Sequence, residues 1–405
     1  MVRARCARRV FSLDLGAIML TLLFRILRLP LGAGVEDTAE GAAPKQEAVA
    51  RKSGAARRIS LVLLSAVVLF VVLELALQVR SQVRFGQSIF NLAKGQTRYI
   101  QDPVTGLKLL RPASVLPGSE VEIRTNSLGL RSPEVTPARL PGSLRIAVVG
   151  ASTVMGEMAR SNEATFSALL HERLQKHYPD RKVEVINAGI AGYRLADQLS
   201  MLKQIVLPLK PDLVVVYPGF NDFADYCKAG KAPAVSSREG LPLLTLPNWL
   251  LSVDAVRKKT VALRSAPPMP GKRLDPASID LLPYRQRLEG LVSAARGAGV
   301  DLVLATNARA YRAEQPLDVQ MRLSEQARYF NPCFDLSGLN TLYDRHNSEI
   351  VQTARRMDVP VLRLDQRIPG GQRYFVDASH FTLAGEELAA DEIYGFLLDQ
   401  HLAGS

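Results

Sequence analysis

The stretch LRIAVVG, residues 144–150, decides the fold that this sequence predicts. It is a short, nearly continuous apolar run, rich in β-branched residues, and it ends in glycine. Four later runs are of the same kind: KVEVINAG (182–189), DLVVVYPG (212–219), DLVLATNA (301–308) and VPVLRLD (359–365). Runs without polar alternation suit strands that are buried on both faces, which is typical of a parallel sheet. We therefore expect a mostly parallel sheet of five strands.

Helical patterns separate these runs. Phe166, Leu169, Leu170 and Leu174 keep the i, i+3, i+4, i+8 spacing of one helix face. Further helix-like segments occupy 195–210, 278–297, 337–357 and 383–401. Strands that alternate with helices predict a doubly wound α/β fold, in which helices flank both faces of the sheet. Open sheets of this kind place their ligands beyond the carboxyl ends of the strands.

One segment ahead of the sheet region can cross a membrane. Ile59 to Val79 is a run of 21 residues with a single charge, at Glu74. A helix of this length spans roughly 30 Å, the thickness of a hydrocarbon core. The segment lacks the polar face that a surface helix of a globular protein shows. We expect one transmembrane helix over residues 59–79.

Positive charge is concentrated beside this segment. Residues 1–84 hold 13 Lys or Arg against 6 Asp or Glu, whereas the rest of the chain holds 38 against 33. Arg51, Lys52, Arg57 and Arg58 precede the segment closely, so the positive-inside rule predicts a cytoplasmic N-terminus. The remainder would then be extracytoplasmic, on the periplasmic side of the inner membrane in a Gram-negative cell. An earlier apolar run at 15–24 is short for a span, and it would reverse this orientation if it crossed.

The expected organisation has four parts. Residues 1–58 form a basic, largely flexible cytoplasmic segment, and 59–79 form the transmembrane helix. Residues 80–143 form a stalk or small subdomain, and 144–405 form the α/β domain. Because the charge excess flanks the membrane segment and no basic patch interleaved with aromatic residues occurs elsewhere, we expect no nucleic-acid partner.

Two cysteines, Cys227 and Cys333, fall in the part expected outside the cytoplasm. An oxidising compartment permits a disulfide. Sequence alone does not show whether their backbones approach closely enough, so a disulfide and two free thiols both stay open. No metal-ligand cluster and no phosphate-binding glycine loop is evident, so neither a metal nor a cofactor is expected.

Residues that could take part in a reaction lie past the ends of four of the strand-like runs. Ser152 follows the first run, Gly192 lies beyond the second, Asn221 follows the third and His380 lies beyond the fifth. All strands of a parallel sheet end at one edge, so these distant residues can meet there. A serine hydroxyl becomes a nucleophile when a base takes its proton. His380 is the candidate base, since it alone of five histidines is expected in a loop beyond a strand.

The other parts of an acyl-transfer site are also present. Asp377 can accept a hydrogen bond from the second ring nitrogen of His380, and Asp365 is a rival for this role. The Asn221 amide and the backbone N–H groups of Ser152 and Gly192 can hold an oxyanion. Each feature also has an ordinary structural explanation. A serine often caps a helix, Gly-x-Asn-Asp often forms a turn, and the His380 loop could simply precede a helix capped by Thr382.

Four blocks resemble those of the SGNH (GDSL-like) hydrolase superfamily: GAST (150–153), NAGIAG (187–192), GFND (219–222) and DASH (377–380). The resemblance covers roughly 144–402, and TNSLGLRSPE (125–134) is similar to the stretch before the first block in membrane-anchored members. It implies an SGNH/flavodoxin-like fold and a hydrolase acting on ester bonds. It also implies a catalytic triad of Ser152, Asp377 and His380, and an oxyanion hole of Ser152, Gly192 and Asn221. Ala151 is a departure, because many members carry Asp there.

Together these features predict a membrane-anchored serine esterase that forms an acyl-enzyme on Ser152. A suitable substrate is an O-acetyl ester on a cell-envelope polysaccharide. Aromatic residues in the long connections 223–276 and 309–336 could stack on sugar rings or simply pack within their loops: Tyr226, Trp249, Tyr311, Tyr329 and Phe330. Two other functions stay open, namely O-acyl transfer to a glycan by the same residues and a non-catalytic glycan-binding or assembly role.

Overall fold

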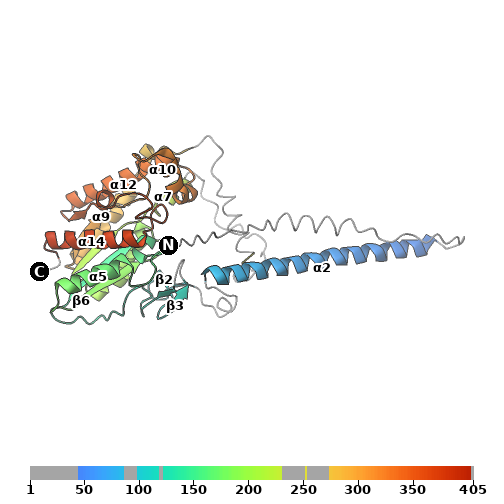
Figure 1. Cartoon of the computed structure of the whole chain (residues 1–405), viewed down its shortest axis with the longest axis horizontal. Helices are drawn as coiled ribbons and strands as arrows, with labels where there is room; N and C mark the ends of the chain where they lie inside the picture. Colours follow the sequence, from blue (N-terminus) through green and yellow to red (C-terminus); the bar gives the residue numbers. More distant parts are fainter. Residues whose placement is uncertain (1–43, 86–97, 118–121, 230–250, 253–272, 403–405) are drawn as a thin grey trace, which may run out of the picture. The chain divides into compact units, whose positions relative to one another are not determined.

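The computed structural model describes residues 44–85, 98–117, 122–229, 251–252 and 273–402 (Figure 1). The expected flexible segment 1–58 lies largely outside the described residues, as does Trp249. The chain divides into two units, Met1–Leu69 and Phe70–Ser405.

Helix α2, Pro44–Phe85, contains the expected membrane segment. Its apolar section, Ile59–Arg80, has 22 residues with a mean hydropathy of 2.8, and 6% of its apolar window is buried. In the part of the chain that the structure describes, this is the one helix whose length and composition would allow it to cross a membrane. Its large apolar side chains, such as Ile59 and Val62, are exposed.

The second unit is built on a five-stranded sheet. Its strands are β5 (Leu144–Gly150), β6 (Val183–Gly189), β7 (Leu213–Tyr217), β8 (Asp301–Ala305) and β9 (Val361–Leu362). They lie in the order β6-β5-β7-β8-β9, and every pairing is parallel. This is the flavodoxin-like order, so the predicted doubly wound fold is confirmed. All five strands therefore end at the same edge of the sheet.

Helices cover both faces of this sheet (Figure 1). On one face α5 (Phe166–His177) packs against α14 (Leu383–Asp399), and on the other α6 (Leu195–Met201) packs against α9 (Leu282–Gly297). Helix α12 (Leu336–Arg356) contacts α9 and the strands β8 and β9. The shorter helices are α4 (Ser152–Met155), α7 (Phe223–Ala229), α10 (Leu317–Leu323), α11 (Glu325–Phe330) and α13 (Leu364–Arg367).

One expected helix is shorter than its sequence pattern. The segment 195–210 begins as α6 but continues as a π-helical turn, Leu202–Val206, and a 3-10 turn, Leu207–Leu209. Pro208 lacks a backbone N–H and so cannot continue an α-helix. The apolar spacing alone did not reveal this change of helix type.

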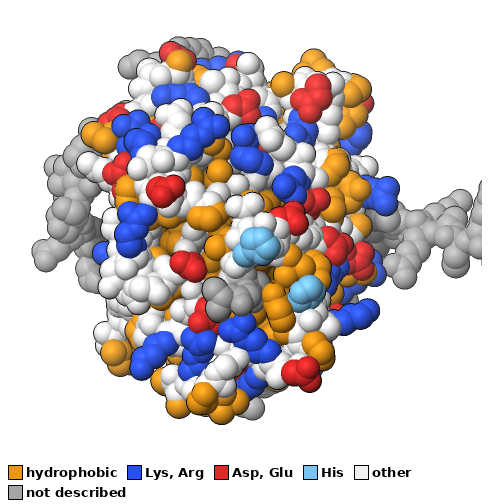
Figure 2. All heavy atoms as spheres, turned by 90° about the vertical axis from the view of Figure 1, so that its left-hand side faces the viewer, with side chains coloured by type: hydrophobic (Ala, Val, Ile, Leu, Met, Phe, Trp, Pro, Cys, Tyr) orange, Lys and Arg blue, Asp and Glu red, His pale blue; other side chains and the backbone are white. Residues whose placement is uncertain are grey.

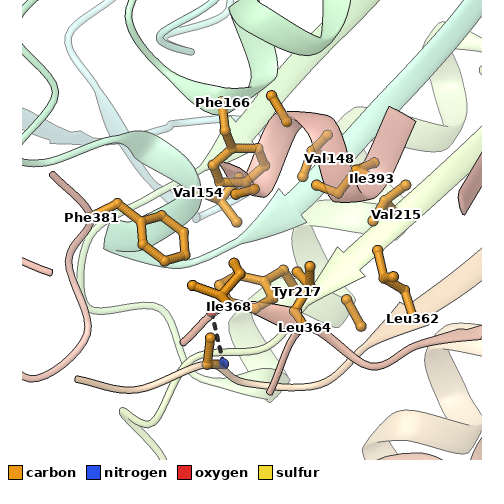
Figure 3. Packing of buried hydrophobic residues seen from close by; sticks show 14 of the residues in the cluster. Val148, Val154, Phe166, Val215, Tyr217, Leu362, Leu364, Ile368, Phe381 and Ile393 are labelled. Atoms are coloured by element: carbon orange, nitrogen blue, oxygen red, sulfur yellow. Dashed lines mark hydrogen bonds between the residues drawn. The ribbon is translucent and has the colours of Figure 1, made fainter. Parts of the chain in front are cut away.

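Strand side chains alternate between two apolar cores. Val148 and Val215 pack with Phe166, Phe381 and Ile393 in the core of Figure 3, whereas the intervening residues of β5 and β7 face the opposite core. Within the first core the hydroxyl of Tyr217 accepts the backbone N–H of Ala308 at 3.1 Å, the dashed line of Figure 3. This bond satisfies a polar group that would otherwise be costly to bury.

Two small hairpins precede the sheet. β1 (Tyr99–Gln101) pairs with β2 (Lys108–Leu110), and β3 (Val115–Pro117) pairs with β4 (Glu122–Arg124), both antiparallel. Their buried side chains, including Leu109 and Ile123, belong to the same core cluster as Val149 of β5. The described residues between 98 and 143 therefore pack onto the sheet domain.

Charged side chains of both signs intermingle at the end of the molecule that carries the C-terminus (Figure 2). No area of a single sign dominates that face. Elsewhere opposite charges form ion pairs near the surface, such as Arg173 with Asp391 at 2.5 Å. Such surface pairs contribute little to stability.

Candidate active site

The loops after the strands bring the expected site residues to one edge of the sheet. Ser152 opens α4 directly after β5, and the loop after β6 returns against it. A Cβ at Gly150 would lie 2.2 Å from Val154, and one at Gly189 would lie 2.3 Å from the backbone nitrogen of Met155. Glycine at these two positions lets α4 pack directly on the ends of β5 and β6.

Ser152 and His380 are hydrogen-bonded to each other. The Oγ of Ser152 lies 2.8 Å from Nε2 of His380, although 228 residues separate them in sequence. The Ser152 hydroxyl does not cap α4, because the N-cap residue is Ala151 and no side chain caps this helix. The capping explanation of this serine is therefore wrong.

Asp377 holds the opposite side of the His380 ring. Its Oδ2 lies 2.7 Å from Nδ1, while Oδ1 accepts the backbone N–H groups of Ser379 and His380 at 3.0 and 2.9 Å. Burial raises the pKa of Asp377, but these hydrogen bonds outweigh burial and hold it below 3.8. An ionised Asp377 keeps the proton on Nδ1, so that the lone pair of Nε2 faces Ser152.

Two alternatives remained for the His380 loop: Asp365 as the orienting acid, and a loop that precedes a helix capped by Thr382. The rival carboxylate, Asp365, accepts hydrogen bonds from Arg363 and Thr306 instead. Thr382 does cap α14, because its hydroxyl accepts the N–H of Gly385 at 3.2 Å. The helix cap and the Asp377–His380 contact thus occur together.

The candidate oxyanion donors come from the segments that follow β5, β6 and β7. Nδ2 of Asn221 donates one hydrogen to the carbonyl of Tyr193 at 2.9 Å, and among the described residues its second hydrogen has no acceptor. A Cβ at Gly219 would lie 3.0 Å from the Cβ of Ala151 and 3.6 Å from this Nδ2, so the amide adjoins both loops. Within the described residues, neither the Ser152 N–H nor the Gly192 N–H donates a hydrogen bond.

Several supporting residues were not predicted as such. Asn187 donates from Nδ2 to the carbonyl of Val154 at 2.8 Å and so holds the serine-bearing helix against β6. Asp222 accepts the N–H of Leu195 at 3.0 Å, which ties the third block to the second, and burial raises its pKa to about 6. Both lie inside the recognised blocks NAGIAG and GFND, but their partners are set by the fold.

Arg131 supports the far end of α4. It is 2% exposed, and its guanidinium donates to the carbonyls of Met155, Gly156 and Ala159 and to Oδ1 of Asn162. Burial lowers its pKa to about 10. The stretch TNSLGLRSPE, which contains it, gave a resemblance but no role for this side chain.

The described aromatic residues proposed for sugar stacking differ in their exposure. Tyr311 is fully buried, so the stacking interpretation is wrong for it. Tyr226 is half-buried, with its hydroxyl 2.9 Å from Nε2 of His346. Tyr329 and Phe330 are exposed and form an edge-to-face pair with ring centroids 5.2 Å apart.

Cys227 and Cys333 form a disulfide, with their Cα atoms 5.4 Å apart. It joins α7 to the turn before α12 and links positions 106 residues apart. The open question of their pairing is thus answered by the fold.

Two hollows in the surface lie away from this site. Two hollows of about 350 and 490 Å³ share Val300 and Asp301 at the start of β8, which is the opposite edge of the sheet from Ser152. Among the described residues, no group of three or more His, Cys, Asp or Glu side chains could hold a metal ion.

Residues 148–388 match the model of the GDSL-like lipase/acylhydrolase family. This match spans more than half of the chain and contains Ser152, Gly192, Asn221, Asp377 and His380. The chain belongs to the GDSL-like lipase/acylhydrolase family. This GDSL-family protein is therefore a hydrolase of the SGNH type that acts on ester bonds.

Solved structures with low similarity to this GDSL-family hydrolase include three esterases or lipases. The lipase/acylhydrolase of Enterococcus faecalis shares 20% identity at a TM-score of 0.39, over 64% of this chain and 96% of that one. An acetyl xylan esterase of Geobacillus stearothermophilus shares 19% identity at a TM-score of 0.39, over 65% of this chain and 96% of that one. A GDSL-like lipase of Bacteroides thetaiotaomicron shares 14% identity at a TM-score of 0.37, over 65% of this chain and 90% of that one. No curated protein matches the chain.

Proposed function

We propose that this GDSL-family hydrolase cleaves its ester through an acyl-enzyme on Ser152. The contact between Ser152 Oγ and His380 Nε2, at 2.8 Å, carries the proposal. As Oγ attacks the ester carbonyl, Nε2 takes its proton, and the charge on Asp377 stabilises the imidazolium. His380 then gives this proton to the departing alcohol.

The same groups complete the cycle. A water molecule loses a proton to His380 and attacks the acyl-enzyme, and the proton returns to Ser152 Oγ as the acid leaves. The tetrahedral oxyanion formed in each half is held by the N–H groups of Ser152 and Gly192 and by Nδ2 of Asn221. Donors fixed before the reaction stabilise the transition state more than the ground state.

We further infer that α2 anchors the enzyme in a membrane with residues 80–405 outside the cytoplasm. The cluster of Arg51, Lys52, Arg57 and Arg58 before the apolar section supports this orientation. The Cys227–Cys333 disulfide supports it independently, because such bonds persist in oxidising compartments. In a Gram-negative cell the site would face the periplasm.

The proposed substrate is an O-acetyl ester on a cell-envelope polysaccharide. An enzyme anchored in this orientation works where such polymers lie. The connection after β8 begins beside the His380 loop, since the N–H of Ala310 donates to the carbonyl of Ala378 at 3.0 Å. The same connection carries the exposed pair Tyr329 and Phe330, whose ring faces suit sugar stacking.

Fluorophosphonate labelling with peptide mapping tests the proposed nucleophile without knowledge of the substrate. We expect the probe to modify Ser152 in the full chain. Ser152→Ala should remove labelling and lower turnover of a small acetyl ester by several orders of magnitude with folding intact. Unchanged turnover in that variant would exclude the acyl-enzyme, and an unlabelled wild-type chain would favour a non-catalytic glycan-binding role.

A second assay separates hydrolysis from acyl transfer. The purified enzyme is incubated with an O-acetylated polysaccharide and a deacetylated acceptor glycan. Release of free acetate without a mass gain on the acceptor supports the esterase. A stoichiometric gain of acetyl groups on the acceptor would contradict it and assign transfer.

A further inference from the structure

Lys108, in the hairpin strand β2, reaches into the loop that follows β6. Its Nζ donates a hydrogen bond of 2.6 Å to the backbone carbonyl of Ala191. That carbonyl and the N–H of Gly192 belong to one peptide unit. The unit is planar and trans, so its C=O and N–H point in opposite directions. Fixing the oxygen of Ala191 therefore fixes where the Gly192 N–H points.

The Lys108 side chain is itself held in place. Nζ lies 4.9 Å from the ring centroid of Tyr99 and 5.8 Å from that of Tyr193, and the side chain is half-buried. The Tyr193 hydroxyl donates to the backbone carbonyl of Lys108 at 2.6 Å. Burial lowers the pKa of Lys108 from 10.5, as does the charge of Arg98, while nearby Asp197 opposes both.

Gly192 meets Lys108 at close range. Its φ is +80°, a left-handed conformation that favours glycine, and a Cβ there would lie 3.3 Å from Nζ of Lys108. On the other side of the same loop, the carbonyl of Tyr193 accepts Nδ2 of Asn221. Lys108 thus holds the Ala191–Gly192 peptide itself, and Asn221 holds the Tyr193 carbonyl two peptide units further along the loop.

We propose that Lys108 is a positioning residue of the oxyanion hole, acting through the Ala191–Gly192 peptide. This role rests on the proposed acyl-enzyme mechanism. A donor on the carbonyl oxygen polarises the peptide and makes its N–H a stronger donor, since linked hydrogen bonds reinforce one another. The gain is largest when negative charge develops opposite the N–H, which happens in the transition state.

Lys108 lies outside the family-matched stretch 148–388. The hairpin that supplies it docks on the sheet domain through Arg98, whose guanidinium bonds both oxygens of Glu157 at 2.8 and 2.7 Å. This chain therefore supplies support for its catalytic loop from a segment outside the family-matched stretch. The reaction itself is unchanged, because Lys108 does not touch the reacting atoms.

The test compares Lys108→Met, Lys108→Arg and Lys203→Met in the full chain, with a small acetyl ester and with the rate of fluorophosphonate inactivation. Removing an oxyanion donor costs about 10²–10³ in kcat, and losing only its support should cost less, about 10-fold, with KM little changed. Lys108→Arg keeps a donor and should recover most of this loss. Lys203 is exposed, so Lys203→Met makes the same charge change and should leave kcat unaltered.

Two results would overturn the role of Lys108: wild-type kcat in a folded Lys108→Met, or equal losses in the Met and Arg variants. The second would show that packing, not the donor, matters. If Lys108→Met does not fold, Lys108→Leu, which likewise lacks a donor, is judged by the same criterion. Ser152→Ala in the same assay reports separately on the mechanism, so a dead Ser152→Ala beside a fully active Lys108→Met would remove only this inference.

Discussion

Asp377 holds His380 at two points, the ring and the backbone. One carboxylate oxygen lies 2.7 Å from Nδ1 and the other accepts the N–H of the same residue at 2.9 Å. The three-residue spacing makes this possible, because the turn folds the histidine back over the aspartate. The carboxylate therefore sets both the tautomer of the imidazole and the conformation of the loop that presents it to Ser152.

Asp377→Asn should lower kcat for a small ester by about 10³–10⁴, because the amide carries no charge and favours the wrong imidazole tautomer. Steady-state kinetics at neutral pH measure the loss. Asp365→Asn makes the same change at the rival carboxylate and should retain activity. An Asp365→Asn enzyme as slow as Asp377→Asn would contradict the assignment of the orienting acid.

Asn221→Ala should lower kcat by about 10²–10³ and leave KM nearly unchanged, since an oxyanion donor acts mainly in the transition state. The substitution also removes the bond to the Tyr193 carbonyl, so the unfolding temperature must be measured in parallel. A stably folded variant with wild-type kcat would show that Asn221 is not a donor in the reaction.

Breaking the Cys227–Cys333 disulfide should lower the free energy of unfolding by about 2–5 kcal/mol, because the bond closes a long loop in the unfolded chain. Thermal unfolding with and without reductant measures the effect. The double variant Cys227→Ser, Cys333→Ser should unfold at the temperature of the reduced wild type and should not respond to reductant. An unfolding temperature that reductant does not alter in the wild type would argue against the bond.

Glu386 should make the enzyme less stable as pH rises. It is buried, which raises its pKa from 4.5 to about 8, although the N–H of Phe166 at 2.8 Å and the charge of Arg131 both favour ionisation. A pKa raised by folding contributes stability that is complete below about pH 4.5 and is lost as pH rises through 8. The free energy of unfolding should therefore fall between pH 5 and 8, by at most about 1.4 kcal/mol per pH unit from this group.

Urea unfolding of the wild type, Glu386→Gln and Glu387→Gln across this range measures the effect. Glu386→Gln should flatten the dependence, because glutamine does not ionise. Glu387 is the exposed neighbour, and its substitution should leave the dependence intact. Parallel curves for all three proteins would rule out the buried carboxyl as the cause.

Most of the sheet and the central contacts of the candidate site could be predicted from local patterns. Apolar runs such as 144–150 appear as strands because a strand buried on both faces needs no polar alternation. Ser152 and His380 meet because parallel strands end at one edge. For Tyr311 the sequence left sugar stacking and packing both open, because its position in a long connection gave no sign that its ring enters the core.

The sequence by itself determined the five strands of the sheet and the main helices between them, the apolar segment 59–79 and the identity of Ser152, Asp377 and His380 as candidates. These follow from periodicity and from short motifs, which act over a few residues. Only the tertiary structure decided that Cys227 meets Cys333 and that Lys108 braces the peptide before Gly192. Such contacts join residues 83 or more positions apart, and they depend on how hairpins and helices dock, which no local pattern encodes.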